Sequence, residues 1–131
     1  MTTLTLAAIT LVVPDYDAGI AFYRDALGFN LVEDTDLGEG KRWVVVRPDQ
    51  GAALLLAKAA DDAQTAAIGN QSGGRVSLFL NVDDFADTHT RFKAAGVTFL
   101  EDPRTEAYGT VAVFCDPFGN RWDLIEPKAS E

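Results

Sequence analysis

Short apolar runs and one helical stretch alternate along the first half of the chain. Residues 9–13 form a β-branched run that predicts a strand. Ile20, Tyr23 and Leu27 then recur at helical spacing, and Gly28 stands where a helix commonly ends in a left-handed residue. The remaining apolar runs of this half predict three more strands, over residues 31–33, 43–47 and 52–57. This half is therefore expected to fold as strand, helix, strand, strand, strand.

The second half repeats this order of elements. Residues 76–82 predict a strand, and Phe85 and Phe92 lie on one face of a predicted helix that ends at Gly96. Three further strands are predicted over residues 97–100, 111–115 and 121–125. Two segments lack a regular pattern and are expected to be loops: residues 58–74, which link the halves with room for a loose turn of helix, and residues 101–109, which would border a pocket.

Polar residues mark the ends of several predicted elements. Asp17 is the expected N-cap of the first helix, and Asp83 or Asp84 is the expected N-cap of the second. The Asp-Pro-Phe-Gly sequence at residues 116–119 predicts a type I turn with glycine in a left-handed conformation. This turn would join the last two strands as a hairpin.

The two halves are related by an internal repeat. Three landmarks recur at one offset of 68 residues: Gly28 and Gly96 after the helices, the Glu-Asp pairs at residues 33–34 and 101–102, and Gly51 and Gly119 in turns between apolar runs. Fixed offsets of this kind indicate a repeated structural unit. The chain is therefore predicted to be a single α+β domain, residues 1–131, built from two βαβββ modules at about residues 4–57 and 75–127.

Alternation along the fourth strand of each module separates two faces. Leu54 and Leu56 point to one face and Leu55 to the other; in the second module, Trp122 and Leu124 share one face, and Arg121 and Asp123 share the opposite one. By the offset, Leu55 corresponds to Asp123. Because an arginine and an aspartate need solvent or polar partners, their face is expected to be the open, concave side of the sheet. The opposite face would then pack on the helix.

The motifs of both halves resemble those of the vicinal oxygen chelate superfamily, which contains glyoxalase I, extradiol dioxygenases, fosfomycin-resistance enzymes and bleomycin-resistance proteins. The resemblance is carried by residues 11–15 (Leu-Val-Val-Pro-Asp) and 22–29 (Phe-Tyr-Arg-Asp-Ala-Leu-Gly-Phe), and by residues 82–84, 93–97, 116–120 and 122–126 of the second half. It implies two βαβββ modules that form a curved, partly open mixed sheet around a cavity. Many members of the superfamily are dimers, and the resemblance implies a homodimer here.

Metal-using members of that superfamily take up to four inward ligands, usually two histidines and one or two glutamates, from the first and fourth strands of each module. The resemblance places these positions on Ala8, Leu55, Ser77 and Asp123. Alanine and leucine have no ligand atom, and one carboxylate alone does not hold a divalent ion at useful affinity. The resemblance therefore implies no metal and no cofactor, and it favours a binding protein of the bleomycin-resistance kind.

The composition excludes other classes of partner. The net charge is −9, from 20 acidic and 11 basic residues, and so acidic a chain should not bind nucleic acid. No apolar run approaches the roughly 18 residues that a membrane span needs. Cys115 is the only cysteine, so no internal disulfide can form, and without an export signal a cytoplasmic location is expected.

Eight residues are candidates for binding a small-molecule ligand at the concave face: Trp43, Leu55, Ser77, Phe79, Asn81, Tyr108, Arg121 and Asp123. Trp43 would supply an aromatic wall, and Tyr108 would cover the pocket mouth, although either could equally pack as an ordinary core or surface aromatic. Asp123 would act as a general base or hold a cationic ligand; the alternative is a carboxylate paired with Arg121 or another base on a partly wet face.

Other conspicuous residues are expected to be structural. His89 is expected to be a half-buried helix residue beside Phe85, and Cys115 an inert packed thiol. The acidic residues at 33–36 and 101–102 are expected to be solvated loop charges.

Two functions remain open from the sequence. The first is a metal-independent binding protein that holds an apolar or aromatic small molecule, with a cationic one suited to the acidic chain. The second is a lyase, isomerase or dioxygenase-like enzyme of the same fold, which would use Asp123 or a metal site that the sequence does not reveal. The metal content of the purified protein would discriminate between them.

Overall fold

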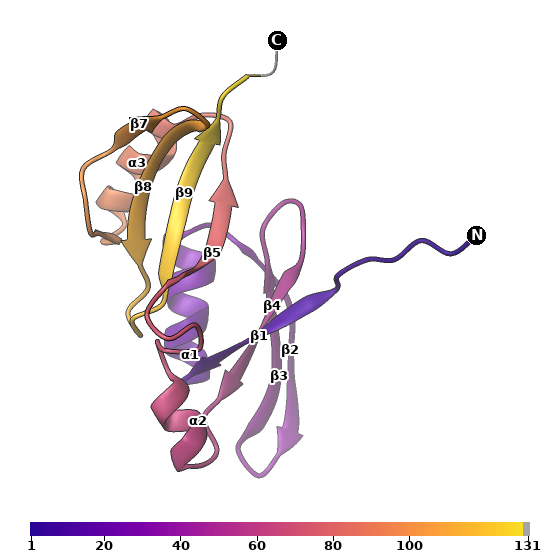
Figure 1. Ribbon diagram of the computed structural model, residues 1–131. Helices are drawn as coiled ribbons and strands as arrows, with labels where there is room; N and C mark the ends of the chain where they lie inside the picture. The colour runs from indigo at the N-terminus through magenta and orange to yellow at the C-terminus, as the bar shows by residue number, and fades with distance from the viewer. Residues whose placement is uncertain (130–131) are drawn as a thin grey trace. The chain divides into compact units, whose positions relative to one another are not determined.

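The computed structural model describes residues 1–129, which fall into two compact units, one ending at Ala67 and the other beginning at Ile68 (Figure 1). In the first unit the elements are β1 (Ala8–Val13), α1 (Tyr16–Ile20) continued by the π-helix η1 (Ala21–Ala26), β2 (Asn30–Gly38), β3 (Lys41–Arg47), β4 (Ala53–Lys58) and α2 (Asp62–Ala67). In the second they are β5 (Val76–Asn81), α3 (Phe85–Ala94), β6 (Thr98–Phe99), β7 (Arg104–Glu106), β8 (Gly109–Cys115) and β9 (Arg121–Pro127). Within residues 1–129, no helix is long and apolar enough to cross a membrane.

The sheets of the two units have the same topology. The first sheet has the order β1-β4-β3-β2 and the second the order β5-β9-β8-β6, with β7 pairing with β8 as a fifth strand. In each sheet the first strand along the chain runs parallel to the last, β1 to β4 and β5 to β9, and the remaining pairs are antiparallel. The predicted α+β class, with a mixed, open sheet in each βαβββ module, is confirmed.

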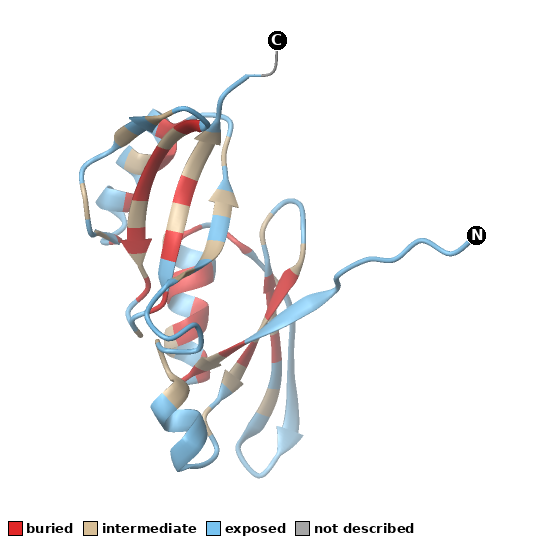
Figure 2. Cartoon of the chain, in the orientation of Figure 1, coloured by how far each residue is buried: buried red, intermediate tan, exposed pale blue. Residues whose placement is uncertain are grey.

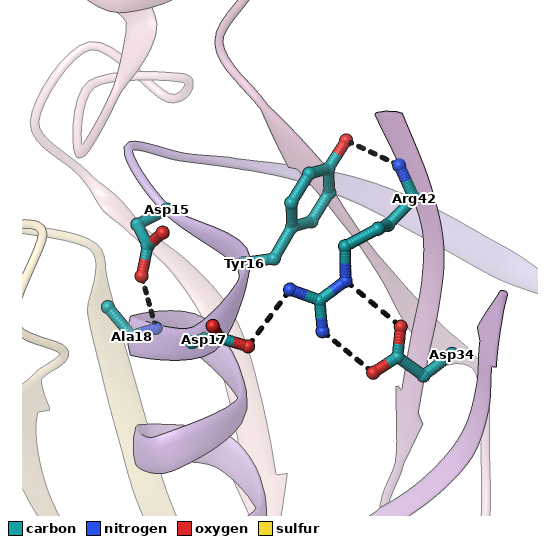
Figure 3. Close-up of polar contacts among 6 residues, drawn as sticks. All are labelled: Asp15, Tyr16, Asp17, Ala18, Asp34 and Arg42. Atoms are coloured by element: carbon teal, nitrogen blue, oxygen red, sulfur yellow. Dashed lines mark hydrogen bonds and ion pairs between the residues drawn. The ribbon is translucent and has the colours of Figure 1, made fainter. Parts of the chain in front are cut away.

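Helices α1 and α3 each begin at an aspartate side chain. Asp15, in an extended conformation, accepts a hydrogen bond from the Ala18 amide at 2.9 Å (Figure 3), and Asp84 accepts one from the Asp87 amide at 3.0 Å. The prediction of Asp17 as the first N-cap is wrong, because the helix starts two residues earlier. Asp17 lies in the first turn, where its charge still favours the helix N-terminus.

In the first unit, α1 packs closely on the sheet. A Cβ added to the buried Gly19 would lie 2.9 Å from Leu56 Cδ1, so a side chain there would have to displace the end of Leu56. Tyr23 of η1 is fully buried, as are Leu56 and the two valines of β3 that share its face. Glycine at position 19 thus sets the distance between helix and sheet.

In the second unit, aromatic rings fill the space between α3 and the sheet. Phe114 of β8 stacks on Trp122 of β9 with ring centroids 5.8 Å apart, and Phe92 of α3 meets Phe114 edge-on at 5.6 Å. Buried and less buried residues alternate along β9 (Figure 2). Trp122 and Leu124 therefore face the helix, as the alternation predicts, and the opposite face is left open.

Two predicted loops contain strands. The acidic residues at 33–36 lie within β2, where Asp34 forms an ion pair with Arg42 of β3. Residues 101–109 contain the short strand β7, which pairs with β8. The predicted loop at 58–74 holds α2, and the predicted turn at residues 116–119 is confirmed by a hydrogen bond from the Gly119 amide to the Asp116 carbonyl.

Candidate functional site

The open face of the second sheet carries most of the predicted site residues. Strand register places Phe79 of β5 and Val113 of β8 on either side of Asp123. Because directly paired residues project from the same face of a sheet, these three side chains are neighbours. Ser77, Phe79 and Asn81 alternate with less exposed residues along β5, and Phe79 is 63% exposed. The face thus combines an exposed aromatic ring with a carboxylate.

The Asp123 carboxylate has an unsatisfied oxygen. Its Oδ1 atom is buried and has no hydrogen-bond partner among the described residues. Burial raises the pKa of Asp123; the positive charge of Arg104 opposes this rise, and the negative charge of Glu101 adds to it. The alternative in which Asp123 simply pairs with Arg121 is not what the structure shows, since none of the ion pairs within residues 1–129 joins these two side chains.

A charged cluster on the segment before β8 lies close to Asp123. Arg104 Nε donates to Glu101 Oε1 at 3.1 Å, and Arg104 Nη1 donates to Glu106 Oε1 at 2.7 Å. Glu106, Tyr108 and Glu101 all hold the pKa of Arg104 above its usual value. Arg104 is therefore a fixed cation with carboxylates on two sides.

Glu101 also completes the β8 ladder, so the prediction that it is a solvated loop charge is wrong. Its Oε2 atom accepts a hydrogen bond from the Val113 amide at 2.9 Å, at the place where the chain leaves β6 and has not yet paired again as β7. The side chain thus takes the role of a backbone carbonyl. The Glu-Asp pair of the repeat marks this position in the sequence, but nothing local indicates its distant partner.

Two predicted site residues, Trp43 and Leu55, belong to the first unit. Leu55 pairs with Val45 in β3 and with Thr10 in β1, and Trp43 lies two residues from Val45 on the same strand. All four side chains therefore share the face opposite α1. Trp43 is 43% exposed, and Leu55 is half-buried. The open face of the first sheet thus carries an accessible indole ring beside the apolar Val45 and Leu55, with Glu33 and Thr35 of β2 paired to Val45 and Trp43 on the same face.

The most elaborate polar cluster of the first unit is structural. Arg42 makes two hydrogen bonds to Asp34, of 3.1 and 2.7 Å, and a third of 2.9 Å to Asp17 in α1 (Figure 3). Its guanidinium lies over the Tyr16 ring at 5.2 Å, and its amide donates to the Tyr16 hydroxyl at 3.2 Å. The cluster joins α1 to β3 and β2. The hydrogen bond that Asp34 accepts from Arg42 lowers the pKa of Asp34.

His89 and Cys115 lie outside the candidate site. His89 contacts the rings of Phe85 and Phe99 with centroids 5.5 and 4.3 Å away, and burial lowers its pKa. Burial raises the pKa of the Cys115 thiol, so the less reactive protonated form is favoured. Both residues have the packing roles that the sequence predicts.

Comparisons with known proteins match this architecture. The family model of the glyoxalase/bleomycin resistance protein/dioxygenase superfamily matches residues 5–124. The chain belongs to this superfamily. It is 50% identical over 125 residues to a protein of Shewanella frigidimarina (strain NCIMB 400), covering 93% of each chain.

The chain is also similar to two proteins of known structure, one of which is described as a binding protein. UcmS2 is 30% identical, with a TM-score of 0.82, and the match covers 95% of this chain and 99% of UcmS2. TnmS3, described as an antibiotic binding protein from Streptomyces sp. CB03234, is 26% identical, with a TM-score of 0.78 and coverage of 98% and 99%. The glyoxalase/bleomycin resistance fold thus includes proteins that bind small molecules.

The residues at the positions that the sequence resemblance assigns to metal ligands do not suit a metal ion. Ala8 and Leu55 have no donor atom in their side chains, and Ser77 and Asp123 supply one hydroxyl and one carboxylate. In the part of the chain that the structure describes, no group of three or more histidine, cysteine, aspartate or glutamate side chains is placed to hold a metal. No step of the superfamily's metal chemistry can be assigned to these residues.

Replacing Asp123 with asparagine is expected to stabilise the protein at pH 7 by about 1 kcal/mol, because it removes a partly buried charge without a partner. The folded-state pKa of Asp123 is raised, so its ionisation destabilises the fold above that pKa. This penalty disappears as the pH falls from the raised pKa toward the ordinary aspartate value near 4. Urea unfolding at pH 7 and at pH 4 should show the gain shrinking; an Asp123→Asn protein less stable than wild type at pH 7 would contradict the prediction.

Proposed function

We propose that this protein is a metal-independent small-molecule-binding protein that holds an apolar or aromatic ligand at the open face of a sheet. The observation that carries the proposal is the pairing of the exposed Phe79 ring with the unpartnered carboxylate of Asp123 on one open face. Exposed aromatic rings beside a few polar groups are typical of ligand sites. Trp43, with Leu55 and Val45 on its face, provides a second aromatic surface in the first unit.

The similarity to TnmS3, an antibiotic binding protein, supports this class of function. The four positions that the resemblance assigns to metal ligands are Ala8, Leu55, Ser77 and Asp123, which together offer one hydroxyl and one carboxylate, so binding is proposed to need no ion. Arg121 and Tyr108 lie at the margin of the second face, on exposed positions of β9 and of the turn before β8. Both side chains border the proposed site.

Acridine, a neutral planar aromatic compound at pH 7, is a suitable first probe. Isothermal titration should detect binding to the wild-type protein, with an unchanged affinity after dialysis against EDTA. Phe79→Ala should weaken binding about tenfold, because stacking on an aromatic ring contributes roughly 1 kcal/mol beyond its buried area. Leu37→Ala, which shortens another exposed apolar side chain at the hairpin between β2 and β3, is the matched control and should bind like wild type.

Several outcomes would contradict this proposal. Affinity that disappears with EDTA and returns with a divalent ion would refute metal independence. Absence of binding, or equal binding by Phe79→Ala, would refute the aromatic site. A stoichiometric divalent metal in the purified protein, together with chemical conversion of an added compound, would favour an enzyme of the same fold that uses Asp123.

We also propose that the protein forms a homodimer. The segment before β1 exposes Leu4 and Leu6 by 90% and 67%, and β1 and β5 each have one neighbour in their own sheet. Exposed apolar residues and unpaired strand edges commonly find a partner. Light scattering at micromolar concentration should give twice the chain mass of 14.1 kDa, and Leu4→Asp with Leu6→Asp should lower it to the monomer value. A wild-type monomer would exclude the dimer.

A further inference from the structure

The buried Oδ1 atom of Asp123 is unusual because it has no hydrogen-bond partner in the described residues. Buried polar atoms in folded proteins almost always have a hydrogen-bond partner, and leaving one without costs about 1–3 kcal/mol. The Asp123 oxygen has none within residues 1–129. The equivalent position in the first module is Leu55, so this place in the sheet does not require a carboxylate for folding.

Neither Arg104 nor Arg121 forms a hydrogen bond or an ion pair with the Asp123 carboxylate. Arg104, whose charge reaches Asp123, donates its hydrogen bonds to Glu101 and Glu106 instead. Arg121 lies two residues away on the same strand and forms no ion pair with it. The protein thus holds its own cations away from an oxygen that can accept a strong, charge-assisted hydrogen bond.

We propose that Asp123 accepts a hydrogen bond from a basic N–H group on the edge of the aromatic ligand, so that the site selects cationic, donor-bearing aromatic compounds. This inference rests on the proposed binding function. Phe79 and Asp123 are directly paired on neighbouring strands about 5 Å apart, so a ring stacked on Phe79 presents its edge to the carboxylate.

The charges around this face favour the same class of ligand. Asp123, Glu101 and Glu106 outnumber Arg104 and Arg121, and the whole chain carries a net charge of −9. A positive group is therefore attracted, and a ligand carboxylate is repelled at the same position. Neutral aromatic compounds gain the stacking but not the hydrogen bond.

Acridine and 9-aminoacridine form a matched pair of probes, because they share one ring system and the second adds a positive charge and N–H donors. Wild-type protein should bind 9-aminoacridine at least tenfold more tightly than acridine in isothermal titration, as expected for a hydrogen bond to a charged group. In Asp123→Leu, which places the Leu55 side chain type at the equivalent position, the ratio of the two affinities should fall close to one. Asp123→Asn provides the same test if the leucine variant does not fold.

Asp83→Asn is the control for charge alone, since Asp83 is exposed and lies outside the open face; its ratio should stay like that of wild type. A preference that survives in Asp123→Leu, or that is lost in Asp83→Asn, would overturn the assignment to Asp123. Equal binding of both probes by wild type, still sensitive to Phe79→Ala, would overturn this inference while leaving the proposed function standing. Binding of neither probe would instead refute the proposed function for planar aromatic ligands.

Discussion

Gly109→Ala is expected to lower the free energy of unfolding by roughly 3 kcal/mol or more. Gly109 is buried at the start of β8 and has a φ of +150°, a conformation that residues with side chains rarely adopt. A Cβ at this position would lie 2.1 Å from the Glu126 carbonyl oxygen and 3.1 Å from the Lys128 amide. Both contacts are with backbone, so no side chain can move away to relieve them.

The steric part of this effect can be separated from the backbone strain. Gly51 also has a positive φ, +93°, but a Cβ there would meet nothing within 4 Å. Gly51→Ala should therefore cost only about 1 kcal/mol, the usual penalty for losing glycine at such a position. Thermal or urea unfolding of both variants measures the difference. Equal losses in the two proteins would show that β9 can move away from β8 at little cost.

The Gly109 contact also bears on the candidate site. The Lys128 amide donates to the Tyr108 carbonyl at 2.8 Å, so the turn between β7 and β8 is held against the end of β9. That turn follows β7, which carries Arg104, whose charge acts on Asp123. If the turn shifts in Gly109→Ala, any loss of ligand binding should accompany the loss of stability.

The order of the elements and the faces of the strands could be predicted from the sequence, because they depend on local alternation. The 68-residue offset relates Leu55 to Asp123, and the structure places both on the last strand of their sheets, facing away from the helices. The offset does not hold for the first strands: Thr10 pairs with Leu55 and Phe79 pairs with Asp123, so these strands correspond at 69 residues instead of 68. The register of β5 also shifts by one residue between Val76 and Leu78, and a bulge of this kind leaves no clear signal in a short apolar run.

The errors fall where a distant partner decides the structure. An acidic run normally indicates a loop, but Asp34 remains in a strand because Arg42 on the next strand makes two hydrogen bonds to it. Glu101 has no local pattern that indicates its hydrogen bond to Val113, twelve residues away. The first N-cap was predicted at the wrong aspartate because Asp15 and Asp17 offer the same chemistry two residues apart.

The residues of the candidate site could be predicted from the sequence, but the lack of a hydrogen-bond partner for Asp123 Oδ1 could not. The alternation along β9 brings Asp123 to the open face, yet the simplest expectation from the sequence is an ion pair with its neighbour Arg121. The carboxylate lacks a partner because Arg104, from a strand that the sequence does not predict, is held by Glu101 and Glu106. The ion pairs of Arg104 with Glu101 and Glu106 therefore determine the chemical property on which the proposed ligand preference depends.

Asp116→Ala is expected to destabilise the protein by about 3 kcal/mol, because this buried side chain satisfies several donors at once. Asp116 is 3% exposed; its Oδ1 accepts from the amides of Phe118 and Asn120 at 3.0 and 2.8 Å, and its Oδ2 accepts from Asn120 Nδ2 at 2.7 Å. Alanine would leave these donors without this acceptor in a place that water reaches poorly, which costs about 1–3 kcal/mol for each buried group that stays unpaired.

The matched control for Asp116 is Asp36→Ala in the hairpin of the first unit. Asp36 Oδ1 accepts from the Gly38 amide at 2.8 Å in the same local pattern, but the bond is exposed and water can replace it. Its loss should cost less than about 1 kcal/mol. Because the Asp116 turn connects β8 to β9, weakening it should also loosen the pairing of Val113 with Asp123, and hydrogen exchange of the β9 amides would report this. An Asp116→Ala protein within 1 kcal/mol of wild type would mean that the turn keeps its shape through its backbone alone.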